Sequence, residues 1–75
     1  TILHVGKHTT GHSHPVSEVY FFVEGRGEIE LDGKRKGVRS KDIVPIMPDE
    51  FHRVYNTSKK DLVFVCVFEK YGERG

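Results

Sequence analysis

Two histidines and a glutamate stand within seven residues of one another near the start of the chain, at His12, His14 and Glu18. Imidazole nitrogens and carboxylate oxygens suit divalent metals such as Mn, Fe, Ni, Co, Cu and Zn. In an extended chain, residues two apart leave the same face, and Glu18 returns to that face if no bulge intervenes. A further histidine, His52, lies downstream. The grouping therefore predicts a metal site.

The same residues also have a plainer interpretation. The two early histidines are then polar loop residues, His52 is a hydrogen-bonded strand residue, and Glu18 caps the polar end of a strand. If the four side chains do bind a metal, one or two coordination positions remain open for water or substrate. An open position distinguishes a catalytic or binding site from a closed structural one.

The elements that must position these residues are predicted to be short β-strands. The apolar run 19–23 follows Glu18 directly and ends at a glycine-rich turn, as a strand does. Residues 28–31 alternate charged and apolar side chains, and Asp32-Gly33 is a strong hairpin signal. They should therefore pair with residues 34–39, a basic segment that is typical of a solvated sheet edge.

The remaining segments continue this pattern along the chain. Residues 2–7 alternate as a short strand does, and residues 43–48 contain two prolines, which favours an edge strand or a bend. Residues 51–55 also alternate, which places His52 near the start of a strand. Residues 62–68 are seven apolar residues without alternation, so a strand buried on both faces is expected there.

Six or seven short strands with turn signals at roughly 8–12-residue spacing predict an all-β sandwich, barrel or jelly roll. A chain of 75 residues is expected to form a single domain, residues 1–75, with a small core. Its one cysteine, Cys66, can form no disulfide within the chain. A bound metal or oligomerisation therefore remains as the source of additional stability.

Charge and hydropathy limit the classes of partner. The 12 Lys and Arg residues nearly balance 11 Asp and Glu residues, for a formal net charge of +1. This balance gives no indication of a nucleic-acid or membrane-surface partner. No apolar run approaches the roughly 20 residues that span a bilayer, and no signal segment is evident, so we expect a cytoplasmic protein. The expected partner is a small-molecule ligand or another copy of the chain.

The spacing of the histidine grouping resembles the first sequence motif of the cupin superfamily. Gly6, five residues, His12-x-His14, three residues, Glu18, six residues and Gly25 fit that motif at every position. The match spans the whole predicted metal grouping and the turn that ends the first long strand.

The second cupin motif fits less closely. It requires Gly, five residues, Pro-x-Gly, two residues, His, three residues and Asn. His52 and Asn56 fall at the required places, but Lys41, Met47 and Asp49 stand where the first glycine, the proline and the second glycine belong. The three residues that differ from the motif affect the expected shape of the turn more than the assignment of His52 as a ligand.

The resemblance implies a double-stranded β-helix, or jelly-roll barrel, whose mouth holds a divalent transition metal. The implied ligands are His12, His14, Glu18 and His52. Asn56 would shape a turn without binding the metal. Cupins usually have further N-terminal strands, so the resemblance also implies a homodimer formed by strand exchange or sheet-to-sheet packing. The apolar segment 62–68 independently requires such a cover.

Two classes of function are compatible with this site. The first is a small metal-dependent enzyme, an isomerase, lyase or dioxygenase acting on a sugar-like compound, an organic acid or dioxygen. The second is a non-catalytic module that binds or senses a metal or small ligand. Tyr20, on the face of Glu18, and His8, in the loop before the site, are the candidate catalytic residues. Both also have ordinary interpretations, as a core tyrosine and an exposed loop histidine.

Overall fold

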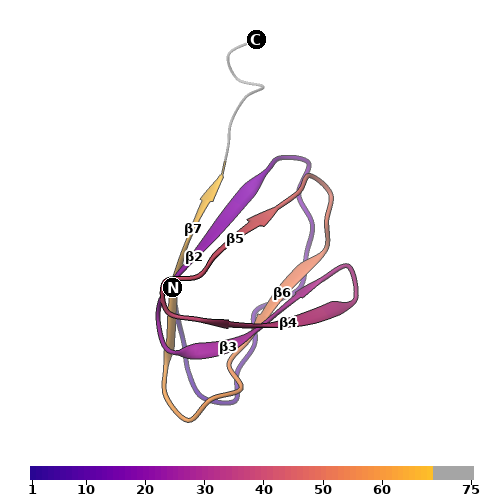
Figure 1. The fold of residues 1–75 in the computed structure, drawn as a ribbon. Coiled ribbons are helices and arrows are strands. Elements are labelled where there is room, and N and C mark those ends of the chain that lie inside the picture. The colour runs from indigo at the N-terminus through magenta and orange to yellow at the C-terminus, as the bar shows by residue number, and fades with distance from the viewer. Residues whose placement is uncertain (69–75) are drawn as a thin grey trace.

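The computed structural model describes residues 1–68, which form seven strands (Figure 1). The strands are β1 (Ile2–Leu3), β2 (Glu18–Glu24), β3 (Arg26–Leu31), β4 (Lys34–Arg39), β5 (Ile43–Ile46), β6 (His52–Tyr55) and β7 (Leu62–Phe68). None of the described residues belongs to a helix of the length and apolarity needed to cross a bilayer. The prediction of an all-β chain is confirmed over this range, and residues 69–75 lie outside it.

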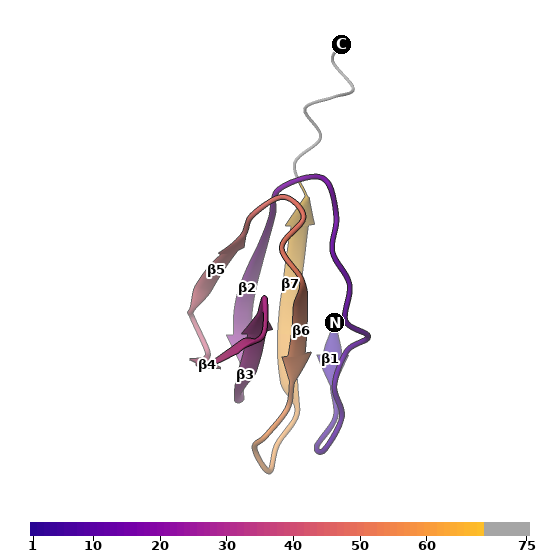
Figure 2. The ribbon, with the colours of Figure 1, turned by 90° about the vertical axis from the view of Figure 1, so that its right-hand side faces the viewer.

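The strands make two antiparallel sheets that face each other (Figures 1 and 2). One sheet has four strands in the order β1-β7-β2-β5, and the other has three in the order β4-β3-β6. Neighbours in the sheets come from distant parts of the chain, since β2 lies between β7 and β5. This is the two-sheet arrangement of a jelly roll rather than a simple meander.

The glycine turn after β2 moves the chain from one sheet to the other. Gly25 has a φ of 94°, in the region that side chains with a Cβ rarely adopt. A Cβ at this position would also collide with the backbone oxygen of Asp61. Because β2 and β3 belong to different sheets, this turn is a corner between layers and not a hairpin.

The hairpin predicted at Asp32-Gly33 is confirmed. β3 and β4 pair from Arg26 opposite Arg39 to Leu31 opposite Lys34. Both turn residues have positive φ, 49° and 87°, as a two-residue turn matching the strand twist requires. β4 is an edge strand with mostly exposed side chains, which agrees with the expectation for its basic residues.

The core lies between the two sheets and is built from alternate residues of each strand. Tyr20 and Phe22 on β2 are buried, and the Tyr20 ring stacks on Phe64 of β7 at a centroid distance of 5.5 Å. Ile29 and Val54 close the core from the three-stranded sheet with no exposed surface. The prediction that Tyr20 shares the inward face of Glu18 is therefore confirmed.

The first strand is shorter than predicted. β1 ends at Leu3, and a turn follows in which the Lys7 N–H donates to the His4 carbonyl at 3.1 Å. Gly6 has a φ of 78° within this turn. The alternation read across residues 2–7 therefore does not persist, because Leu3 is buried while Val5 is half exposed.

The prediction that residues 62–68 are buried on both faces is wrong for the single chain. β7 has the predicted bounds, and its inward residues Leu62 and Phe64 are buried. On the outer face, Val65 is 44% exposed and Val67 is 59% exposed. One side of the strand is thus uncovered in this chain.

Besides Asp32 in the hairpin, two further non-glycine residues among residues 1–68 occupy backbone conformations that favour glycine. Lys41 has a φ of 77° and Asp49 a φ of 65°. These are the two positions at which the second cupin motif has glycine, so the chain keeps the turn geometry without the residue that suits it best. A left-handed conformation costs an ordinary residue roughly 1–2 kcal/mol. Both turns are therefore fixed by their surroundings rather than by local preference.

Candidate metal centre

The chain segment before β2 lies along β6, which brings the early histidines to His52. The Asn56 N–H donates to the Lys7 carbonyl at 2.9 Å, and the Thr9 N–H donates to the Val54 carbonyl at 2.9 Å. His12 and His52 then exchange two backbone hydrogen bonds, at 3.2 and 2.9 Å. The two histidines are therefore held directly opposite each other by the main chain.

A one-residue bulge separates the two ends of this pairing. His8 bridges to Tyr55 and His12 bridges to His52, so four steps along one chain oppose three along the other. An extra residue reverses the face on which later side chains lie. His8 and His12 are four residues apart, so in a regular strand their side chains would lie on the same face. The bulge places them on different faces, so that His12 reaches the cluster and His8 does not.

His14 is positioned by a turn rather than by a strand. Its carbonyl accepts a hydrogen bond from the Asp49 N–H at 2.5 Å, which joins the segment before β2 to the turn before β6. A bend at Pro15-Val16 follows, and β2 begins only at Glu18. The condition on which Glu18 would share a strand face with His12 and His14, an uninterrupted strand, is therefore not met, although the side chains still converge.

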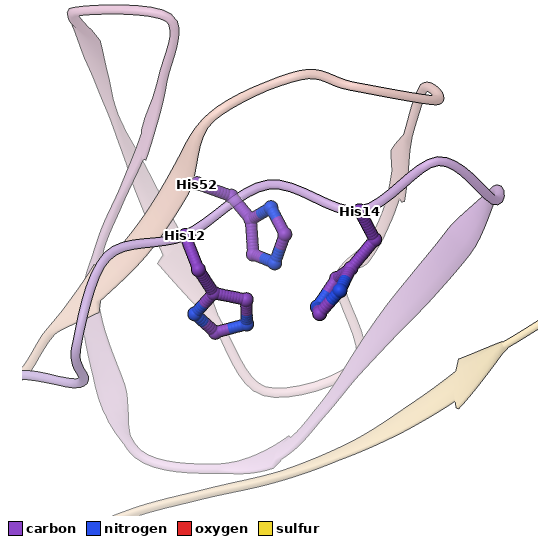
Figure 3. Close-up of side chains that lie close together, drawn as sticks. All are labelled: His12, His14 and His52. Atoms are coloured by element: carbon purple, nitrogen blue, oxygen red, sulfur yellow. The ribbon is translucent and has the colours of Figure 1, made fainter.

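The three imidazoles point toward one another (Figure 3). Their closest ring nitrogens all lie within 4.8 Å of one another. The ring centroids are 4.5 Å apart for His12 and His14, and 4.6 Å apart for His12 and His52. Separations of this size are those expected of ligands arranged about one ion with metal–nitrogen bonds of about 2.1 Å. The three-histidine cluster can therefore hold a metal.

Backbone carbonyls fix the tautomer of two of these rings. Nδ1 of His12 lies 2.8 Å from the Thr10 carbonyl, and Nδ1 of His52 lies 3.1 Å from the Glu50 carbonyl. A carbonyl can only accept, so each Nδ1 must carry the proton and donate it. The lone pair of the neutral ring is then on Nε2, and the ring is held in the orientation that a metal ligand needs.

Glu18 adds a carboxylate oxygen to the same point. Its Oε1 lies 3.2 Å from Nε2 of His52 and 3.8 Å from Nε2 of His14. Glu18 is 2% exposed and His52 is 1% exposed.

The buried atoms of this cluster lack hydrogen-bond partners. Among the described residues, Nε2 of His14, Nε2 of His52 and Oε1 of Glu18 make no hydrogen bond. Leaving a buried polar group unsatisfied costs about 1–3 kcal/mol, and more when it is charged. A divalent cation satisfies all three atoms at once, so the residues present fit a metal.

Tyr20 lies just below the cluster, one inward position beyond Glu18 on β2. Its ring is 5.7 Å from the His52 ring, and it faces Cys66 across the β2–β7 pairing. Burial, followed by the nearby Cys66 and Glu18, raises the pKa of the Tyr20 phenol. Burial likewise raises the pKa of the Cys66 thiol. Both groups therefore stay protonated at neutral pH, and a protonated Cys66 thiol is unreactive.

The structure does not bring His8 to the cluster. Its ring packs 5.7 Å from Tyr55, and its Nδ1 lies 3.0 Å from the Thr9 carbonyl. His4 is also remote and contacts Asp61 at 3.0 Å. These two exposed histidines provide natural controls for the clustered three.

Sequence reasoning missed the groups that orient the cluster. The Thr10 and Glu50 carbonyls are main-chain atoms, and nothing in a residue type reveals them. Phe68, whose ring lies 5.2 Å from that of His14, was also not singled out. Its position at the end of the apolar segment 62–68 was the only available signal.

The cupin domain model matches residues 1–68 of the chain. The chain is a cupin. The match includes both histidine motifs and all seven strands, so the expected membership is confirmed. The fold is accordingly the all-β cupin fold with two antiparallel sheets.

Known proteins similar to this cupin are considerably longer. An uncharacterised protein of Methanocaldococcus jannaschii is 35% identical over 66 residues, which cover 87% of this chain and 53% of that protein. The 5-nitrosalicylic acid 1,2-dioxygenase of a Bradyrhizobium species is 29% identical over 68 residues, 91% of this chain and 33% of the enzyme. The cupin thus spans about half or less of these relatives.

Solved structures show the same architecture. The crystal structure of a cupin protein from Bacteroides fragilis superposes with a TM-score of 0.87 at 29% identity. The similarity covers 95% of this chain and 62% of that protein.

Proposed function

We propose that this cupin binds a divalent transition metal through His12, His14, His52 and Glu18, and uses it to act on a small oxygenated molecule. The observation that carries the proposal is the convergence of three buried ligand atoms without hydrogen bonds. The set of three imidazoles and one carboxylate suits Mn, Fe, Ni, Co, Cu or Zn. When bound, such a metal supplies a Lewis acid, or a redox centre if it is Fe, Mn or Cu.

The ligand set leaves room for a substrate. Four protein ligands are fewer than the five or six positions that most of these metals accept, so one or two remain open. His12 is exposed while Glu18 and His52 are buried, so a small molecule can reach the centre beside His12. The dioxygenase named among the relatives supports chemistry with dioxygen as one member of this class.

Tyr20 is proposed to position the substrate as a hydrogen-bond donor. Its ring lies on the buried side of the cluster, and its raised pKa keeps the hydroxyl protonated. A protonated phenol can donate to an oxygen atom held near the open positions but cannot act as a base. His8, exposed and packed on Tyr55, has no comparable access.

We expect Tyr20→Phe to bind metal as the parent protein does but to lose about 100-fold in turnover, the loss typical of removing one hydrogen-bond donor that stabilises a transition state. The measurement is a screen of the metal-loaded protein against sugars, organic acids and diketones, with and without a chelator. Turnover that needs metal and falls in the variant supports the enzyme. Tight ligand binding without turnover in either protein would favour the alternative, a binding or sensing module.

We also propose that the cupin is a homodimer that packs two copies sheet to sheet. The outer face of the four-stranded sheet is apolar along its paired positions except at its edge, where Glu24 lies opposite Val63. Its rows are Ile43–Phe21–Val65, Pro45–Val19–Val67 and Ile2–Val63–Glu24. Within these rows, Ile43 is 64% exposed and Val67 59% exposed, a contiguous apolar patch that a monomer rarely leaves open. A second copy presents the same apolar rows about a twofold axis, with Glu24 at their margin.

Sedimentation equilibrium should give about twice the 8.6 kDa of the chain. Phe21→Lys, within the patch, should yield a folded monomer, because each copy would have to bury an unpaired lysine in an apolar interface. Ser40→Lys, which adds the same charge at an exposed site outside the patch, should leave the dimer intact. A wild-type monomer, or equal dissociation in both variants, would contradict the proposed interface.

A further inference from the structure

The end of the barrel opposite the metal centre carries an open groove. β2 and β6 both begin at the metal centre, because Glu18 and His52 are their first residues. Both strands finish at the other end of the barrel, where the connection between β6 and β7 lies (Figure 2). The groove has a volume of about 440 Å³. It is lined by Arg26, Arg39, Asp42, Glu28, Thr57 and Ser58, among others.

Further cationic side chains extend the groove. A second depression continues from it, sharing Arg26, Thr57 and Ser58, and is lined in addition by Lys59 and Lys60. Four cations thus surround a surface on which two hydroxyl groups are also present. None of these residues belongs to the metal centre.

Arg26 and Arg39 lie directly opposite each other on β3 and β4. Like charges in opposite positions of a sheet destabilise the pairing. Within residues 1–68, neither guanidinium is among the ion pairs closer than 4.0 Å. The arrangement therefore places two positive charges close together, and neither makes a direct ion pair in the described part of the chain.

The carboxylates that line the groove are held by other groups. Oε1 of Glu28 lies 2.8 Å from Nε of Arg35, which also stacks over the Tyr55 ring. Oδ2 of Asp42 accepts a hydrogen bond from the backbone N–H of Arg39 at 3.0 Å. Glu28 is thus paired with another arginine, and Asp42 is held by the main chain of the turn after β4, so neither forms an ion pair with Arg26 or Arg39 within 4.0 Å among residues 1–68.

We propose that this groove binds a phosphate group, free or carried by a small ligand, between Arg26 and Arg39. Directly opposed residues have Cβ atoms about 5 Å apart, so two flexible arginines can converge on one anion. Each guanidinium offers a planar fork that matches two oxygens of a phosphate. A dianion balances both charges, whereas a single carboxylate balances one. The Thr57 hydroxyl adds a neutral donor beside them.

This site is independent of the metal proposal. It shares no residue with His12, His14, His52 or Glu18, and lies at the other end of the strands. Loss of metal binding would leave the groove unchanged, and failure to bind phosphate would leave the metal centre unchanged. The experiment is therefore done on both metal-loaded and chelated protein.

The decisive comparison removes equal charge at two places on the same hairpin. Inorganic phosphate is titrated by calorimetry at low salt into wild type, Arg26→Gln/Arg39→Gln and Lys34→Gln/Lys36→Gln. We expect the arginine pair of substitutions to weaken binding about tenfold or more, and the lysine pair to change it by less than about twofold. Methyl phosphate in place of phosphate distinguishes a group carried on a ligand from the free anion.

A steric variant tests the site without changing charge. Gly37 lines the groove, and a Cβ added there would meet no atom within 4 Å. Gly37→Leu should therefore fold and weaken phosphate binding by filling the groove. In the absence of phosphate, the double arginine variant should melt no lower than wild type, because repulsion is removed. No binding to wild type at millimolar phosphate, or equal weakening by the lysine substitutions, would overturn the proposal.

Discussion

His52→Ala should abolish metal uptake, with a loss of affinity of about 100-fold or more. His52 is the buried member of the cluster, and its Nε2 faces both the other rings and the carboxylate of Glu18. Removing a hydrogen-bond partner that only orients a ligand lowers metal affinity about 10–100-fold. Removing the ligand itself should lower metal affinity by more. Metal content per chain, measured by elemental analysis after dialysis against trace metal, checks this expectation.

The matched controls are the two histidines outside the cluster. His8→Ala and His4→Ala remove the same side chain from exposed positions and should retain wild-type metal content. His12→Ala, a change at the exposed ligand, should behave like His52→Ala while disturbing the core less. Equal metal content in wild type and both ligand variants would contradict the assignment.

Stability provides a second measurement on the same variants. A ligand that binds only the folded state stabilises it by about 2.7 kcal/mol at 100 times its dissociation constant. A chelator should therefore lower the melting temperature of wild type and have no effect on His52→Ala. Glu18→Gln, which keeps shape and removes charge, should give an intermediate response if the carboxylate is a ligand.

The parts of the fold that sequence predicts are those fixed by neighbouring residues. The Asp32-Gly33 hairpin, the alternation around His52 and the inward parity of Tyr20 follow from local turn chemistry and the two-residue period of strands. The ligand grouping was also recognisable, because its spacing matches a known motif. The hairpin and the two alternation patterns each depend on a few consecutive residues, whereas the motif extends from Gly6 to Gly25.

The remaining features depend on contacts between distant segments. The pairing of residues 7–12 with β6 and its bulge decide that His12, not His8, enters the centre. Positive φ at Lys41 and Asp49 is imposed by the surrounding turn, against the preference of both residues. The outer face of β7 is exposed because no other element of this chain packs on it among residues 1–68. The residues of one strand do not determine whether such an element exists.

Asn56 is expected to be the most sensitive polar residue of the fold. It is 4% exposed, and its amide Nδ2 donates to the carbonyls of Leu3 and Lys60, both at 2.8 Å. Its Oδ1 accepts from the Ser58 N–H at 3.0 Å. The side chain therefore joins β1 to the turn between β6 and β7, which agrees with the shaping role that its motif implied.

Asn56→Ala should lower the free energy of unfolding by about 2–4 kcal/mol, since it breaks several hydrogen bonds and leaves buried carbonyls unsatisfied. That is a large part of the roughly 5 kcal/mol expected of so small a domain. Thr57→Ala, an exposed neighbour, should change stability by less than about 0.5 kcal/mol. Urea denaturation of chelated protein at neutral pH measures both.

Asn56→Asp separates hydrogen bonding from the loss of volume. The new carboxylate turns an oxygen toward the two carbonyls that the amide satisfied, which should destabilise the chain at least as much as alanine at pH 7.5. Burial beside carbonyls disfavours the charged carboxylate, so its folded-state pKa lies above the unfolded value. The deficit relative to wild type should therefore shrink as pH falls toward 5, because protonation removes the charge and restores one donor. A deficit for Asn56→Ala should show no such trend, and identical pH profiles for the two variants would mean that packing, not hydrogen bonding, is what Asn56 contributes.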